Sequence, residues 1–203
     1  MTTTNSASNA AATLTDLSGT YTIDPSHTSI GFVARHAMVT KVRGTFNEFE
    51  GSAVVDGADL AASTATLTIQ AASIDTRNDQ RDAHLRSNDF LAMDEFPQIT
   101  FQSTSVRQTD DTTVELTGDL TIKGVTKSLT IPFEYQGAAT DPFGNFRVGF
   151  EGSTVINRKD WGVNWNAPLE AGGVLVSEKV TIEVDISAIK EQAAVPEAVP
   201  TDS

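Results

Sequence analysis

The chain of 203 residues contains no cysteine and only three histidines, His27, His36 and His84. The lack of cysteine excludes disulfide bonds, thiolate catalysis and cysteine-ligated metals. No two histidines share the H-x-H or H-x-x-x-H spacing of ligands on one element, so the sequence predicts no metal site. A centre that joins all three to Asp24 or Asp82 remains an alternative. No catalytic residue is predicted either, since there is no G-x-S-x-G motif and no marked carboxylate pair.

Basic residues are also scarce, at 14 Lys and Arg against 27 Asp and Glu, for a net charge of -13. Such a surface repels phosphate backbones, and we expect no nucleic-acid partner. No stretch approaches the roughly 20 apolar residues of a membrane helix, so stable membrane insertion is not expected. The first residues lack the basic and apolar regions of a secretory signal, which predicts a cytoplasmic location.

Apolar residues recur with a period of two through most of the chain. The clearest examples are "SIGFVARHAM", "TATLTIQAA", "TVELTGDLTI", "LTIPFEY", "VGFEGSTVI" and "VTIEVDI". Turn residues such as "DPFGN" separate these stretches. The pattern is typical of antiparallel strands with one buried face, and it predicts an all-β sandwich or barrel of about eight strands.

The segment "DTRNDQRDAHLRSNDFLAMDEF" breaks this pattern with many charges and few β-branched residues. It predicts a short helix, capped by Thr76 or Asn78 and reaching about Ser87. The two ends of the chain, residues 1–18 and 189–203, are poor in large apolar groups and are predicted to be disordered tails. A single domain over residues 19–188 is left between them.

Small residues alternate with aromatic ones on the predicted inner faces. Gly118 and Gly152 are among the small residues, and Phe133 and Phe150 are among the aromatic ones. Small residues opposite large ones either leave a cavity or allow tight packing. The pattern alone favours packing, because filled interiors are usual.

Four blocks in order resemble the YceI-like family. They are "YTIDPSHTSIGFVARHAMVTKVRGTFNEFEG" (21–51), "SIDTRNDQRDAHLRSNDFLAMDEFPQITF" (73–101), "GDLTIKGVTKSLTIPFEY" (118–135) and "GFEGSTVINRKDWGVNW" (149–165). The resemblance implies an extended eight-stranded antiparallel lipocalin-like β-barrel, with a short helical segment near one mouth. It further implies an amphiphilic polyisoprenoid ligand in the barrel: an isoprenoid quinone, a quinone precursor or a prenyl phosphate. Many family members carry a secretory signal, and the lack of one here disfavours a periplasmic role.

The ligand-binding candidates are the aromatic residues expected at the interior or mouth and the polar residues expected near the ligand head. They are Phe32, His36, Phe46, Phe49, Arg77, His84, Phe101, Phe133, Phe150, Trp161 and Trp165. Each has a structural alternative. The histidines and arginines could instead have structural roles, as hydrogen-bonded groups or as i,i+4 charge pairs. The two tryptophans are expected on one face of a strand and could instead belong to the core.

The expected function is therefore carriage, storage or sequestration of a hydrophobic molecule, without enzymatic activity and without a cofactor. Two alternatives remain open. One is an enzyme that uses His36 as acid or base, and the other is a filled barrel that acts as a stress-related interaction module. A homodimer formed through the barrel rim is a further open alternative.

Overall fold

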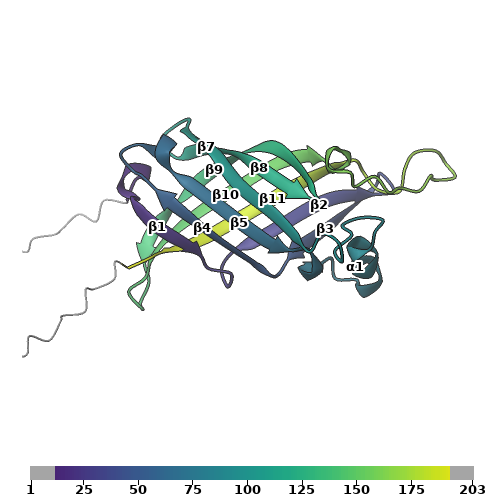
Figure 1. Cartoon of the computed structure of the whole chain (residues 1–203), viewed down its shortest axis with the longest axis horizontal. Helices are drawn as coiled ribbons and strands as arrows, with labels where there is room; N and C mark the ends of the chain where they lie inside the picture. Colours follow the sequence, from purple (N-terminus) through teal and green to yellow (C-terminus); the bar gives the residue numbers. More distant parts are fainter. Residues whose placement is uncertain (1–11, 193–203) are drawn as a thin grey trace, which may run out of the picture.

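The computed structural model describes residues 12–192, which form one closed antiparallel β-barrel (Figure 1). The strands are β1 (Gly19–Ile23), β2 (Ser29–His36), β3 (Thr40–Phe46), β4 (Phe49–Val55), β5 (Thr64–Gln70), β6 (Ile74–Asp75), β7 (Gln98–Gln108), β8 (Thr113–Ile122), β9 (Val125–Thr140), β10 (Phe146–Asn157) and β11 (Lys179–Lys190). The short helices are η1 (Leu14–Asp16), η2 (Leu60–Ala62), η3 (Ala71–Ser73), α1 (Asp79–Arg86) and η4 (Arg158–Trp161).

These segments make eight long strands around the barrel, as predicted. β1 and β2 both pair with β11, and they form one bent strand interrupted between Ile23 and Ser29. β3 and β4 form another, since β3 pairs with β2 while β4 pairs with β1. β6 is a two-residue addition to the edge of β3. The pairing of β1 with β11 closes the barrel and removes the exposed sheet edges that would otherwise invite aggregation.

The period of two in the sequence separates an inner from an outer face. Along β11, Ile182, Val184, Ile186 and Ala188 point to the interior. Glu183 and Asp185, which alternate with them, are exposed. The same alternation on the other strands produces a single apolar core inside the barrel.

Two inner glycines make room for aromatic rings. A Cβ on Gly118 would overlap the ring of Phe101, and a Cβ on Gly152 would stand 2.6 Å from the Phe133 ring. Gly152 and Phe133 face each other across β10 and β9. These glycines therefore serve tight packing, which was the favoured interpretation of the sequence pattern.

The two ends of the barrel differ. The α1 end carries α1, η4 and the β2–β3 turn, and the η1 end carries η1, η2 and both ends of the described chain (Figure 1). The helix prediction is confirmed: the Asn78 side chain caps α1 by accepting a bond from Arg81 N at 2.9 Å, and Ser87 ends it. The helix thus lies near one mouth of the barrel.

The described structure extends beyond the predicted domain limits at both ends. Leu14 and Leu17 are each 2% exposed and belong to the core, because η1 folds across its end of the barrel. β11 continues through Lys190, two residues beyond the expected limit. The remainder of both predicted tails lies outside the described residues.

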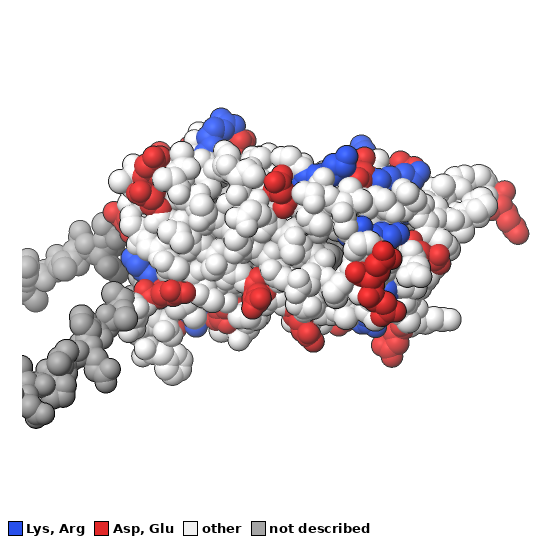
Figure 2. Space-filling model, viewed as in Figure 1, with Lys and Arg blue, Asp and Glu red and all other residues white. Residues whose placement is uncertain are grey.

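Charged residues of both signs are interspersed on the face shown in Figure 2, with no continuous basic patch. Across residues 12–192, no helix has the length and apolar character required to cross a membrane.

Candidate functional site: an apolar cavity inside the barrel

A cavity of about 260 Å³ runs inside the barrel. It extends from Leu14 and Leu17 at the η1 end to Ile69, Leu120 and Ile122 toward the α1 end. None of its lining residues is charged, and the few polar ones are Tyr21, Ser52, Ser63, Thr64 and Thr66. A single water needs roughly 10–15 Å³, so the space is large, and a cavity with such walls favours hydrocarbon over water.

Two alanines face each other in the cavity wall. Ala53 of β4 and Ala65 of β5 face each other directly, and both line the space. The neighbouring strand positions Ser52, Thr64 and Thr66 are exposed and also border the cavity. The sequence reasoning placed Ala65 on an apolar face but missed both residues as cavity formers. Only the register between β4 and β5 puts the two small side chains opposite each other.

Tyr21 of β1 is the one tyrosine among these lining residues. It is 2% exposed, and its hydroxyl has no hydrogen-bond partner within residues 12–192. Burial, with a smaller contribution from Tyr135, raises the pKa of Tyr21. The phenol therefore stays a neutral hydrogen-bond donor. The sequence reasoning also missed this residue.

The aromatic candidates divide into two groups. Phe101, Phe133 and Phe150 line the cavity. Phe32 and Phe46 pack against each other with ring centroids 5.9 Å apart, and Phe46 and Phe49 pack against the edge of the core. The structure thus brings three of the six phenylalanines to the cavity wall.

The two tryptophans do not lie on a strand, contrary to the expectation. Trp161 ends η4, is 3% exposed and donates from Nε1 to the Leu120 carbonyl at 2.9 Å. Trp165 lies in the following loop, where its ring stacks edge-on against His84 with centroids 4.7 Å apart. Phe90 contacts both Trp165 and His84. This aromatic group covers the α1 end of the barrel.

A buried arginine holds the loop that follows η4. Arg158 is 6% exposed and donates to the carbonyls of Ser177 and Val163 at 2.9 and 2.6 Å. Its guanidinium also lies 5.9 Å from the centre of the Phe90 ring. Burial lowers the pKa of Arg158. Sequence reasoning missed this residue, because nothing local to "NRKDW" marks it as buried.

The polar head-group candidates lie away from the cavity. His36 is exposed at the end of β2. Arg77 is exposed beside an outer groove, which also contains Glu183 and Asp185 from the outer face of β11. His84 bonds to Asp89 at 2.8 Å. None of the three is among the residues that line the internal cavity.

The charged residues around α1 have a structural role. They bond to backbone groups and do not form the expected i,i+4 pairs. Arg81 donates to the Thr76 carbonyl at 2.7 Å, and Arg86 donates to the carbonyls of Ala72 and Ile74, both at 2.8 Å. Asp82 is buried and accepts a bond from Thr76 N at 2.9 Å. These contacts fix the helix to the barrel. Across residues 12–192, no group of three potential ligands could hold a metal ion.

His27 and Asp24 organise the break between β1 and β2. His27 Nδ1 lies 2.7 Å from Asp24 Oδ2, as expected for a hydrogen-bonded turn. Arg147 of β10 donates to the same Asp24 oxygen at 2.5 Å and to Asp141 at 2.8 Å. These bonds hold the pKa of Asp24 well below its usual value, and the bond from Arg147 has a larger effect than the bond from His27. Bonds from Asn145 and Arg147 lower the pKa of Asp141.

A closed eight-stranded antiparallel barrel with an uncharged internal cavity defines a small protein of the lipocalin-like class. The family model described as "YceI-like domain" matches residues 21–188, and the chain belongs to that family. UPF0312 protein SAB2563 of Staphylococcus aureus (strain bovine RF122 / ET3-1) is 40% identical over 164 residues, which cover 80% of this chain and 93% of the relative.

Two solved structures show the same fold. Burkholderia cenocepacia BcnA superposes with a TM-score of 0.72 at 23% identity, covering 81% of this chain and 98% of BcnA. A domain from Saccharophagus degradans, described as a polyisoprenoid binding domain implicated in plant cell wall breakdown, has a TM-score of 0.64 at 16% identity, covering 84% and 98% of the two chains.

Proposed function

We propose that this protein binds an amphiphilic polyisoprenoid lipid in its barrel, for carriage, storage or sequestration. The observation that carries the proposal is the cavity of about 260 Å³ with no charged residue in its lining. A long apolar chain fits such a wall, because each Å² of buried apolar surface contributes roughly 25 cal/mol before ordering costs are subtracted. The description of the Saccharophagus degradans domain as polyisoprenoid-binding supports the choice of lipid class.

The energetic cost of the cavity also favours a ligand. At ~24 cal/mol per Å³, an empty apolar cavity of about 260 Å³ costs roughly 6 kcal/mol. That is comparable to the whole free energy of unfolding of a typical domain, about 5–15 kcal/mol. An apolar chain restores the lost contacts with the cavity wall, and we therefore expect ligand binding to stabilise the fold strongly.

Mass spectrometry tests the proposal on an organic extract of the protein, purified from its own host without detergent. We expect a stoichiometric prenyl lipid. The delipidated protein should then rebind geranylgeraniol more tightly than a straight-chain alcohol of equal length. An empty extract, together with no rebinding of either alcohol, would contradict lipid binding. Equal rebinding of both alcohols would contradict the choice of a prenyl chain.

A further inference from the structure

Tyr21, a residue of the cavity wall, carries a buried hydroxyl donor. The residue lines the cavity and is 2% exposed, and within residues 12–192 its hydroxyl has no acceptor. Most buried hydroxyls in folded proteins have partners, because an unpaired one loses its bonds to water without replacement. The position therefore suits a ligand atom that accepts a hydrogen bond.

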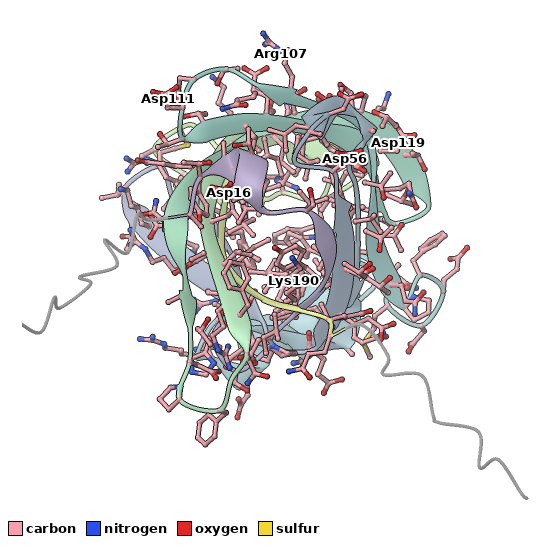
Figure 3. All side chains as sticks on the ribbon, turned by 90° about the vertical axis from the view of Figure 1, so that its left-hand side faces the viewer. Asp16, Asp56, Arg107, Asp111, Asp119 and Lys190 are labelled. Carbon is pink, nitrogen blue, oxygen red and sulfur yellow. The ribbon has the colours of Figure 1, made fainter. Side chains whose placement is uncertain are left out.

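Lys190 lies at the η1 end of the barrel, where its side chain passes close to Gly19 of β1. It continues the inner face of β11 one position beyond the lining residues Val184, Ile186 and Ala188. It also faces Tyr21 directly across the β1–β11 ladder. Side chains in such pairs start from Cβ atoms roughly 4.5–5.5 Å apart. Looking into this end of the barrel, Figure 3 shows Lys190 toward the middle of the ring of strands.

The ammonium group of Lys190 is available for a ligand. Its Nζ lies 5.8 Å from the centre of the Phe146 ring, and no carboxylate of the described residues lies within ion-pair distance. The nearby acids are engaged elsewhere: Asp16 accepts bonds from Thr13, and Glu191 accepts one from Thr22. A half-buried cation over an aromatic ring can attract an anion.

Three donors at the α1 end already have partners. Arg158 donates to backbone carbonyls, and Lys123 donates to the carbonyls of Asn88 and Gly162 at 3.3 and 3.4 Å. The indole of Trp161 is likewise bonded to the Leu120 carbonyl. This end offers aromatic and aliphatic surface to a ligand, but none of these three donors is spare.

We propose that the ligand lies in one orientation, with an anionic, hydrogen-bond-accepting head between Tyr21 and Lys190 and its chain directed toward Trp161. Tyr21 donates its hydroxyl proton to a head oxygen, and Lys190 neutralises the charge at the rim. This proposal rests on the proposed function, and it names the head class as a phosphate or carboxylate. It places the head at the opposite end from His36, Arg77 and His84.

The test measures binding of two probes with the same prenyl chain, geranylgeranyl phosphate and geranylgeraniol, to the delipidated full chain. Lys190→Met removes the charge and keeps the length of the side chain. Tyr21→Phe removes only the hydroxyl. Lys179→Met is the matched control, because Lys179 is exposed at the other end of the same strand. Circular dichroism verifies folding, and Lys190→Gln replaces Lys190→Met if the latter does not fold.

We expect the wild type to prefer the phosphate on the order of tenfold, the factor that one charge-assisted bond supplies. Lys190→Met should remove this preference and leave alcohol binding unchanged. Tyr21→Phe should weaken both probes severalfold, and Lys179→Met should change neither. If both probes bind but Lys190→Met and Tyr21→Phe have no effect, the head lies elsewhere and only this proposal fails. If neither probe binds the wild type, the proposed function fails and the orientation fails with it.

Discussion

Ala53 of β4 and Ala65 of β5 face each other on the inner wall of the barrel, where both line the cavity. A core packed to ordinary density would hold larger side chains at one of the two positions. The pair therefore provides the most direct way to close the cavity by substitution.

Ala53→Phe should fill the cavity and lower the affinity for the prenyl alcohol at least tenfold, because the ring occupies space that the chain needs. Val54→Phe is the matched control, since Val54 is the next residue on β4, is 52% exposed and faces outward. Fluorescence displacement on the two delipidated variants measures the difference. Equal affinities would show that the chain does not lie between β4 and β5.

Gly152→Ala should lower the free energy of unfolding by about 1–3 kcal/mol, the usual cost of overpacking. The added methyl would stand 2.6 Å from two atoms of the Phe133 ring. Gly149→Ala, on the same strand, is the control. Its methyl would meet Gln136 at 3.4 Å, an ordinary contact, and we expect a change near zero or a small stabilisation. Urea unfolding of both variants checks the contrast, which would be lost if the Phe133 ring can move aside.

Tyr21→Phe should stabilise the ligand-free protein by about 1 kcal/mol, because it removes a buried hydroxyl that has no acceptor within residues 12–192. For a domain of this size, 1 kcal/mol raises the melting temperature by roughly 2–4 °C. The same variant should bind the prenyl probes more weakly. A fall in the melting temperature of the delipidated variant would show that the hydroxyl has an acceptor in the folded protein.

Arg158→Met should lower the free energy of unfolding by about 2–4 kcal/mol, because it leaves the carbonyls of Ser177 and Val163 buried without a donor. Arg158→Lys should recover only part of this loss, since an ammonium cannot reproduce the planar fork. Arg107→Met is the control: its side chain is 68% exposed and pairs with Glu115 at the surface, so the loss should stay below about 1 kcal/mol. A loss no larger than that of Arg107→Met would exclude a structural role for the buried guanidinium.

The stability of the fold should fall in acid as Asp24 and Asp141 become protonated. Hydrogen bonds hold the pKa of both carboxyl groups well below the usual value for an aspartate in the folded protein. A depressed folded pKa adds stability that is fully present above the unfolded pKa and is lost as the pH falls from about 4 toward the folded pKa. Arg147→Met should flatten this dependence, because Arg147 bonds both groups. Melting temperatures between pH 6 and pH 2 measure it, and parallel curves for the two proteins would assign the acid sensitivity to other groups.

Much of the fold was readable from the sequence because it depends on local information. The alternation in "VTIEVDI" defines the inner face of β11. The stretch "RNDQRDAHLR" contains both the helix α1 and the residue that caps it. These signals lie within a few residues of one another, so a period or a capping residue is enough to predict them. The resemblance across four blocks identified the family for the same reason.

The cavity and its polar groups depend on pairing between distant segments. In the sequence, Gly118 and Gly152 fitted either a cavity or tight packing, with packing favoured, and in the fold they accommodate the rings of Phe101 and Phe133. Strand register places the two small lining residues Ala53 and Ala65 opposite each other. It also pairs Lys190 with Tyr21, whose hydroxyl has no partner within residues 12–192. The sequence alone determined which residues face inward. Strand register and barrel closure decided which inward residues meet, and thereby where the interior remains unfilled and which polar atoms lack partners.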